Sequence, residues 1–311
     1  MKILILGSGA IGSALGGFLS RKTKVSLVGR KKHINAIKKN GLQITGIWGK
    51  HNFKNFDKLY FSPKEILKNT YFDFIFITTK AYSTEEIVKQ STHFLKKCNY
   101  VISLQNGLGN WEKISKVISL KKTIGGMVIF GAKILKPGLV DITVFAKPTQ
   151  IGKLTFPRFD KNLKSLVEVM NQCGLATKFT LKIEDDILAK FLYNCALNPL
   201  GAILNFNYGE LSTNKHTKNI MNKIIKEAIN ILKNKKFQIP FKEKQYLKLF
   251  YKKLIPPTVK HYPSMLEDLK FKRQTEINFL NGKIVEWGKK LKIKTPYNEI
   301  LTEIIKAQSL M

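Results

Sequence analysis

The chain of 311 residues is poor in cysteine, and this shortage excludes two kinds of scaffold. Its cysteines, Cys98, Cys173 and Cys195, lie far apart and form no CxxC pair, which argues against a disulfide framework or a structural zinc site. The five histidines are scattered, and none stands at metal-ligand spacing from a cysteine or carboxylate. We therefore predict no metal site, and we expect each histidine on the surface.

Acidic residues and arginines are also scarce. The chain has 21 Asp and Glu against 54 Lys and Arg, a formal charge of +33, and only four of the basic residues are arginines. A nucleic-acid-binding protein usually favours arginine and interleaves aromatic residues along a basic strip. Here lysines are spread over the whole chain. We therefore predict no specific nucleic-acid partner, only nonspecific adhesion to polyanions at low salt.

Long apolar runs are missing as well. The run at residues 2–6 is too short for the core of a signal peptide, and no run approaches the length of a membrane span. We therefore expect a soluble, cytoplasmic protein with no membrane partner, as a monomer or a homodimer. With 44% hydrophobic residues, the chain is long enough to bury the cores of two domains.

A glycine motif stands directly between a predicted strand at 2–6 and a helical run at 13–19. The motif consists of Gly7, Ser8, Gly9, Ala10, Ile11 and Gly12. In a strand–turn–helix, the first glycine permits the tight turn, the second lets a pyrophosphate approach the backbone, and the third lets helix pack on strand. The motif predicts a dinucleotide-binding site, with an unliganded glycine-rich turn as the alternative.

A second predicted strand, at 24–28, ends in Gly29-Arg30-Lys31-Lys32. An NAD-selective site usually places an acid here, about twenty residues past the glycines, on the ribose 2′-hydroxyl. Because this chain has cations instead, we predict that Arg30 binds the 2′-phosphate of NADP.

Two further strands, at 71–79 and 100–104, flank a helix at 83–94. Lys80 follows the first strand and Asn106 follows the second. Since the carboxyl ends of parallel strands form the ligand crevice of an open sheet, both side chains are predicted to point to the same place as Gly9.

The predicted secondary structure changes near residue 181, from mixed strands and helices to helices alone. Before it we expect strands at 123–130, 139–145, 149–152 and near Leu175, with a helix at 162–172; after it we expect only helices, at 183–204, 217–235, 241–255, 264–292 and 296–308. The predicted fold class is α/β: a Rossmann-type NADP-binding domain at 1–181, followed by an all-helical domain at 182–311.

The first of these helices is almost wholly apolar, yet Lys190, Asn194 and Asn198 recur in it at four-residue spacing. That spacing places all three on one face. Burying an unpaired ammonium or amide costs several kcal/mol, so such a stripe either faces water or meets a polar ligand. Its place at a predicted domain junction, where ligand clefts concentrate, favours the ligand.

With these residues assembled, the chain resembles the ketopantoate reductases from end to end. Because these enzymes belong with the two-domain enzymes similar to 6-phosphogluconate dehydrogenase, the resemblance implies that the helical domain at 182–311 is the substrate and catalytic domain and is similar to the C-terminal domain of 6-phosphogluconate dehydrogenase. The motifs that carry the resemblance are Gly7-Ser-Gly-Ala-Ile-Gly12, Thr79-Lys-Ala81, Gln105-Asn-Gly-Leu-Gly109, Lys190-Phe-Leu-Tyr-Asn-Cys-Ala-Leu-Asn-Pro-Leu200, Gly209-Glu-Leu211, Ser264-Met-Leu-Glu-Asp268 and Thr275-Glu-Ile-Asn-Phe-Leu-Asn-Gly282. One departure is Tyr208, because many relatives have Asn at that position, and here Asn207 stands one residue earlier.

The resemblance implies NADPH-dependent reduction of a small 2-keto acid, 2-dehydropantoate, to (R)-pantoate on the route to pantothenate and coenzyme A. It also implies roles for individual residues: Lys190 as general acid, Asn194, Asn198 and Ser264 on the substrate, Glu276 near the substrate hydroxyl and the nicotinamide, Lys80 along the cofactor, and Asn106 on cofactor and substrate. The chemistry agrees, since an ammonium can stabilise the oxyanion formed by hydride transfer and surrender a proton.

Two alternatives remain open at this point. The chain could be a related enzyme of the same family that reduces other branched 2-keto acids or acts as a D-2-hydroxyacid dehydrogenase. Some of these relatives use NADH. A redox sensor or nucleic-acid-binding protein could merely carry a dinucleotide domain, although a sensor has no need of a proton donor such as Lys190.

Ser264 and Glu276 are twelve residues apart, which is about 18 Å along an unbroken helix and too far for one small substrate. We therefore predict a break at 272–274. Ser264 and Glu267 are predicted to form a capping box for the first segment, and Thr275 to cap a second helix that begins at Glu276.

Overall fold

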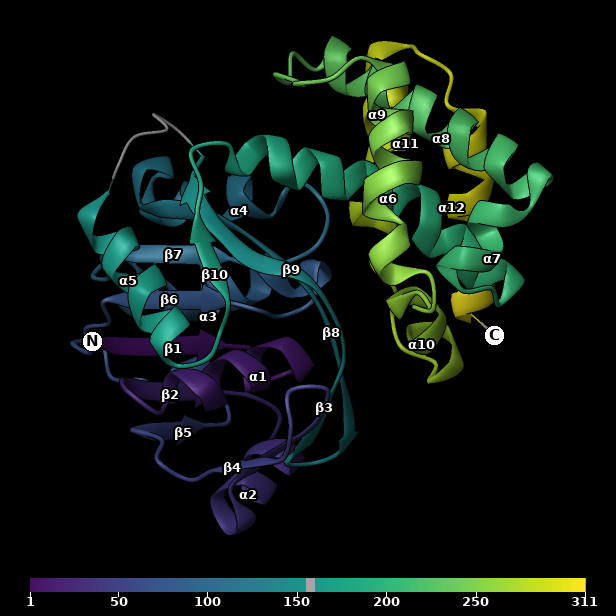
Figure 1. Cartoon of the computed structure of the whole chain (residues 1–311). Helices are drawn as coiled ribbons and strands as arrows, with labels where there is room; N and C mark the ends of the chain where they lie inside the picture. Colours follow the sequence, from purple (N-terminus) through teal and green to yellow (C-terminus); the bar gives the residue numbers. More distant parts are fainter. Residues whose placement is uncertain (155–159, 311) are drawn as a thin grey trace. The chain divides into compact units, whose positions relative to one another are not determined.

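The computed structural model describes residues 1–154 and 160–310 and divides into two compact units (Figure 1). The N-terminal unit comprises Met1–Gln105 and Gly109–Glu184, and the C-terminal unit comprises Asn106–Leu108 and Asp185–Met311. The short segment Asn106–Leu108, which the division by sequence placed in the first domain, groups with the second unit. One reason is that the Leu108 N–H donates to the Phe279 carbonyl at 3.1 Å.

Within the described residues of the N-terminal unit, ten strands form one sheet. They are β1 Lys2–Leu6, β2 Lys24–Val28, β3 Leu42–Gly46, β4 His51–Phe53, β5 Lys58–Tyr60, β6 Phe74–Ile77, β7 Tyr100–Ser103, β8 Thr123–Lys136, β9 Leu139–Lys153 and β10 Thr177–Phe179. The order is β4-β3-β9-β8-β7-β6-β1-β2-β5, with β10 beside β9. The pairs β8–β9 and β3–β4 are antiparallel, and the other pairs are parallel.

The parallel strands are apolar because both faces of the sheet are covered. In β1, Ile3 and Ile5 belong to one buried core and Leu4 and Leu6 to another. The first core includes side chains of α1 Ala10–Leu19, α2 Lys31–Asn40 and α5 Lys161–Gln172, and the second includes those of α3 Thr84–Leu95 and α4 Asn110–Ile118. Strand order reverses between β1 and β6, as in the Rossmann fold, so the predicted α/β class is confirmed.

The region after β7 differs from the prediction in detail. The three strands expected over 123–152 are two long ones, β8 and β9, whose antiparallel pairing has several register shifts. One shift falls between Met127 and Ile129, opposite the segment that contains Pro148, and a proline without an N–H is tolerated at such an irregularity. Helix α4, directly after β7, was not predicted, and neither were four short elements that precede β7, namely α2, β3, β4 and β5.

The described part of the C-terminal unit is helical. Its helices are α6 Ile183–Leu204, which begins in the N-terminal unit, α7 Tyr208–Thr213, α8 Lys215–Asn234, α9 Glu243–Leu249 with a π-helical extension Phe250–Leu254, α10 Ser264–Lys270, α11 Asn281–Leu291 and α12 Pro296–Leu310. The expectation that no apolar run approaches a membrane span is wrong for α6, which is long and apolar enough by composition. Because 72% of its most apolar window is buried, α6 has the character of a core helix.

The predicted break after Ser264 is confirmed. Helix α10 ends at Lys270, and Lys272 adopts a left-handed conformation, with φ of 49°. The predicted caps are wrong. Pro263, whose ring fixes φ, takes the N-cap position and leaves Ser264 as the first helical residue. Glu276 precedes only a short 3₁₀ turn, Ile277–Phe279, and α11 begins at Asn281.

Candidate active site

The glycine loop lies at the carboxyl end of β1, and its three glycines differ in backbone conformation and in the space around them. Gly7 has φ of +108°, a conformation that side chains rarely adopt. A Cβ on Gly12 would lie 2.1 Å from the Gly7 carbonyl oxygen, so only glycine lets α1 pack this closely. A Cβ on Gly9 would meet nothing within 4 Å. The backbone at Gly9, the N-cap of α1, therefore faces open space, and a helix N-terminus of this kind is suited to a phosphate group.

Strand β2 holds this loop and places Arg30 beside it. The N–H groups of Gly7 and Ser8 both donate to the Val28 carbonyl, at 3.1 and 2.8 Å. Gly29 packs so tightly on Ser8 that a Cβ would lie 1.7 Å from the Ser8 hydroxyl oxygen. Arg30 follows at once as the exposed N-cap residue of α2. Arg30 therefore directly follows the strand that holds the loop, at the position where a cation for a 2′-phosphate is expected.

His33 is buried, which contradicts the expectation of a surface histidine. Its Nδ1 accepts from the Gly138 N–H at 3.1 Å, so its proton is on Nε2, which lies 3.0 Å from the Ser13 hydroxyl oxygen. That hydroxyl in turn donates to the Ser8 carbonyl at 3.1 Å. Burial and, to a lesser extent, Arg30 lower the pKa of His33 to about 4. The neutral ring of His33 thus stabilises the glycine loop through the Ser13 hydroxyl.

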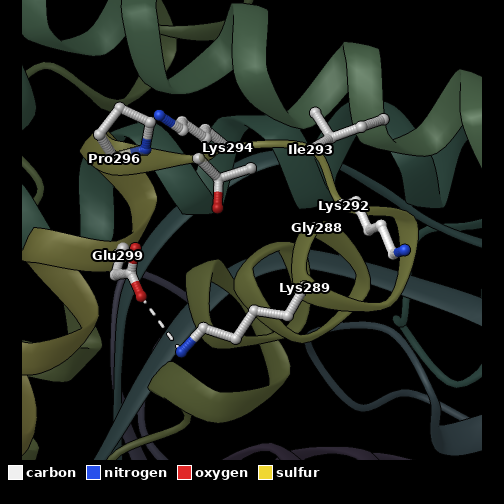
Figure 2. Close-up of a pocket in the computed structure, with 8 residues that line it drawn as sticks. Gly288, Lys289, Lys292, Ile293, Lys294, Pro296 and Glu299 are labelled. Carbon is white, nitrogen blue, oxygen red and sulfur yellow. Dashed lines mark ion pairs between the residues drawn. The ribbon is translucent and has the colours of Figure 1, made fainter.

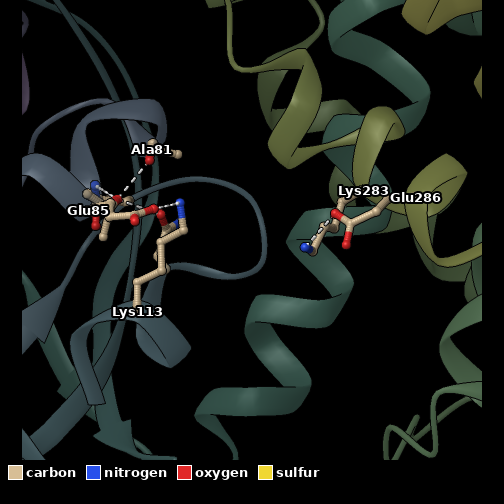
Figure 3. A network of polar contacts seen from close by, with 8 residues as sticks. Ala81, Glu85, Lys113, Lys283 and Glu286 are labelled. Carbon is tan, nitrogen blue, oxygen red and sulfur yellow. Dashed lines mark hydrogen bonds and ion pairs between the residues drawn. The ribbon is translucent and has the colours of Figure 1, made fainter. Parts of the chain in front are cut away.

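A buried polar network joins the carboxyl ends of β6 and β7, partly shown in Figure 3. Gln105 donates to the Thr79 carbonyl at 3.0 Å and to the Thr84 hydroxyl at 2.8 Å. The Thr84 hydroxyl is also 2.8 Å from both the Ala81 carbonyl and the Asn110 side chain. This network fixes the backbone around Lys80, a half-buried residue that follows β6, the neighbour of β1 in the sheet.

In the C-terminal unit, the polar stripe of α6 is buried instead of facing water. Asn194 and Asn198 are each 6% exposed, and Lys190 is partly buried on the same helix. Two amides within an apolar core need polar partners. The structure therefore disfavours the interpretation of these residues as a solvated face.

Lys190 and Glu276 interact electrostatically although 86 residues separate them in the sequence. Burial lowers the pKa of the Lys190 ammonium to about 8, and the negative charge of Glu276 opposes that shift. Glu276 itself is 6% exposed. A lysine with a pKa close to neutrality can hold a proton and also release it, as a general acid must.

Tyr208 supplies a partner that the sequence did not reveal. Its hydroxyl donates to Asn198 Oδ1 at 3.4 Å, and its ring packs edge-on against Tyr193 at a centroid distance of 5.6 Å. Asn207, one residue earlier, caps α7 by accepting from the Glu210 N–H at 2.9 Å. The residue at the departure from the family pattern thus contacts the stripe, whereas Asn207 is used as a cap.

Asn106 and Ser264 also belong to the C-terminal unit. Gly107, next to Asn106, packs so closely on the turn after Glu276 that a Cβ would lie 2.5 Å from the Phe279 carbonyl oxygen. Ser264 is exposed at the start of α10, where Pro263 takes the N-cap position. This unit therefore contains Asn106, Lys190, Asn194, Asn198, Ser264 and Glu276, all the predicted substrate and catalytic residues.

An open pocket of about 410 Å³ lies elsewhere in this unit (Figure 2). Residues at the end of α11 and the start of α12 line it, and Lys289 and Glu299 form an ion pair of 3.1 Å across it. Its lining contains none of the predicted site residues. We therefore do not assign the reaction to this pocket.

Comparison with known proteins finds full-length relatives. The family model described as ketopantoate reductase PanE/ApbA matches residues 3–155, and the model for its C terminal matches 182–309. A 2-dehydropantoate 2-reductase of Aquifex aeolicus is 40% identical, covering 100% of this chain and 97% of the relative; one of Pyrococcus horikoshii is 35% identical, covering 99% and 97%. The ternary structure of D-mandelate dehydrogenase with NADH and anilino(oxo)acetate aligns with a TM-score of 0.88 at 29% identity, covering 99% and 98%.

Proposed function

The chain belongs to the ketopantoate reductase family, and from this premise we propose how its residues carry out the NADPH-dependent reduction of 2-dehydropantoate to (R)-pantoate in pantothenate biosynthesis. The observation that carries the proposal is the electrostatic pairing of Lys190 with Glu276. It supports the proposal because an ammonium and a buried carboxylate interact within the unit that also contains Asn194 and Asn198.

Lys190 donates the proton. NADPH supplies the hydride, and the ketone oxygen that receives the electron pair develops negative charge. The Lys190 ammonium stabilises that charge and transfers its proton to the oxygen. The pKa of about 8 means that the donor is mostly protonated at neutral pH yet gives up its proton more readily than an ordinary lysine.

The remaining residues bind and orient. Asn194 and Asn198 on α6, with Ser264 on α10, bind the substrate by hydrogen bonds, for which the amides and the hydroxyl supply donors and acceptors. Glu276 accepts from the substrate hydroxyl and supports the charge of Lys190. Asn106 contacts both substrate and cofactor.

The N-terminal unit binds the cofactor. The residues assigned to it are the glycine loop (Gly7, Ser8, Gly9, Ala10, Ile11 and Gly12), Arg30 and Lys80. The open backbone at Gly9 fits a diphosphate, and Arg30 fits a 2′-phosphate. The enzyme acts on a small 2-keto acid in the cytoplasm, as a monomer or a homodimer, without specific nucleic-acid or membrane partners.

A substrate panel tests this proposal. NADPH oxidation is measured with 2-dehydropantoate and with alkyl 2-keto acids that lack its hydroxyl, and we expect the highest kcat/KM for 2-dehydropantoate. The informative competitor is phenylglyoxylate, the keto acid of mandelate, because one structural neighbour is a D-mandelate dehydrogenase. A preference for such a hydroxyl-free keto acid would replace the proposed substrate while keeping the reaction type.

Replacement of Glu276 by Gln tests the role of the carboxylate. We expect kcat/KM for 2-dehydropantoate to fall about ten- to a hundredfold, the worth of one charged hydrogen bond. The fall should be smaller for a keto acid without the hydroxyl, and NADPH binding should be unchanged. Glu286→Gln is the control, since Glu286 pairs in the same unit with Lys283 (Figure 3) and with Lys290. Equal losses on both substrates would remove Glu276 from hydroxyl recognition.

A further inference from the structure

Helix α6 contains a proline directly after one of its two buried asparagines. In an α-helix the N–H of each residue donates to the carbonyl four residues earlier, and proline has no N–H. Pro199 therefore leaves the Cys195 carbonyl without its helical donor. This carbonyl lies between Asn194 and Asn198, and Cys195 is fully buried. A buried carbonyl without a donor is destabilising and would leave this turn of the helix free to shift.

Asn281, the first residue of α11, supplies the missing donor. Its Nδ2 donates to the Cys195 carbonyl at 3.0 Å and, with its second hydrogen, to Asn298 Oδ1 at 3.0 Å. Asn281 and Asn298 are both 0% exposed. Because Nδ2 faces two acceptors, the orientation of the Asn281 amide is fixed.

Asn298 is itself anchored at the start of α12. Its Nδ2 donates to Glu227 Oε2 at 2.7 Å, and its backbone N–H donates to the same oxygen at 3.1 Å. The second carboxylate oxygen of Glu227 accepts from the Tyr297 N–H at 3.1 Å. A chain of directed hydrogen bonds thus runs from a carboxylate on α8 through α12 and α11 to α6.

We infer that Asn281 is a positioning residue that sets the geometry of Asn194 and Asn198 by holding the Cys195 carbonyl between them. The inference rests on the proposed function, in which these two asparagines bind the substrate. Asn281 does not touch the substrate in this account. Its effect reaches the reaction through the backbone of α6, so substrate binding should respond to its loss and cofactor binding should not.

The test is a double-mutant cycle of Asn281→Ala and Pro199→Ala. Asn281→Ala should raise the KM for 2-dehydropantoate and lower kcat/KM about tenfold, with the KM for NADPH unchanged. Pro199→Ala restores an N–H that can bond the Cys195 carbonyl within the helix. In that background Asn281→Ala should cost less than about threefold, because the carbonyl is already satisfied. Melting temperatures of the four proteins should show the same coupling.

Ile305→Ala is the control for destabilisation alone, because Ile305 is fully buried on α12 and has no part in the hydrogen-bond chain. It should lower the melting temperature and leave the KM for 2-dehydropantoate unchanged. Equal costs of Asn281→Ala in both backgrounds would overturn the inference. An Asn281→Ala protein that melts earlier but keeps its KM, as Ile305→Ala does, would also overturn it.

Asn298→Ala gives a second route if the Asn281 variants do not fold. It leaves the bond to Cys195 but frees the Asn281 amide, so the substrate KM should rise about threefold without a change for NADPH; an unchanged substrate KM would contradict the inference. The proposed function is tested separately by the wild-type protein. If that protein reduced no 2-keto acid, the function would fail, while the melting-temperature coupling would still decide whether Asn281 holds α6.

Discussion

Lys190→Ala should lower kcat for 2-dehydropantoate by about two to four powers of ten, the usual worth of a general acid. The variant loses the group that stabilises the oxyanion and protonates it, and no other lysine lies on the buried stripe of α6. Alanine is a good helix former, so α6 and the fold should persist, although the Glu276 carboxylate loses its counter-charge and the melting temperature should fall. Steady-state kinetics measure kcat, and circular dichroism measures the fold.

Lys182→Ala is the matched control, because Lys182 is an exposed lysine just before α6. It should leave kcat within about a factor of two, as surface substitutions usually do. NADPH affinity should survive in both variants, because the cofactor residues other than Asn106 and Glu276 belong to the N-terminal unit. A Lys190→Ala protein with near-normal kcat would exclude Lys190 from the chemistry.

Arg30→Ala should weaken NADPH binding about ten- to a hundredfold and leave NADH binding nearly unchanged. Arg30 directly follows Gly29, which packs on Ser8 of the glycine loop, and the 2′-phosphate is the group by which the two cofactors differ. Dissociation constants of both cofactors, measured by fluorescence titration at fixed salt, give the comparison.

The control for Arg30 is Lys39→Ala, an exposed cation in the last turn of the same helix α2. It should change both dissociation constants little, since long-range attraction of a charged cofactor is screened by salt. If Arg30→Ala weakened NADPH and NADH equally, Arg30 would not read the 2′-phosphate.

Local patterns were enough to predict the Rossmann-type half of the fold. A buried strand, the glycine motif and a helix follow one another within residues 2–19. The strands on either side of β1 in the sheet, β2 and β6, are short and mostly apolar runs. The elements between residues 40 and 60 were not predicted because three strands of three to five residues show too little periodicity. The roles assigned to the site residues stay predictions.

Hydrogen bonds between residues that are distant in the sequence could not be predicted from the sequence alone. His33 is buried because it bonds to Ser13 and to Gly138, which is 105 residues away. Asn281 bonds to the Cys195 carbonyl across 86 residues. Pro199 within an apolar helix was a usable signal, since a proline inside a helix always leaves a carbonyl to be satisfied elsewhere. The identity of that donor required the structure.

The pH dependence of kcat/KM for 2-dehydropantoate tests the role of Lys190 most directly. A general acid must be protonated, so activity is full below the pKa of the donor and falls about tenfold per pH unit above it. With the pKa of Lys190 at about 8, the decline should begin near that pH, and Glu276→Gln should move it lower because the carboxylate raises this pKa. A profile that stays flat until pH approaches the ordinary lysine value of 10.5 would contradict Lys190 as the buried proton donor.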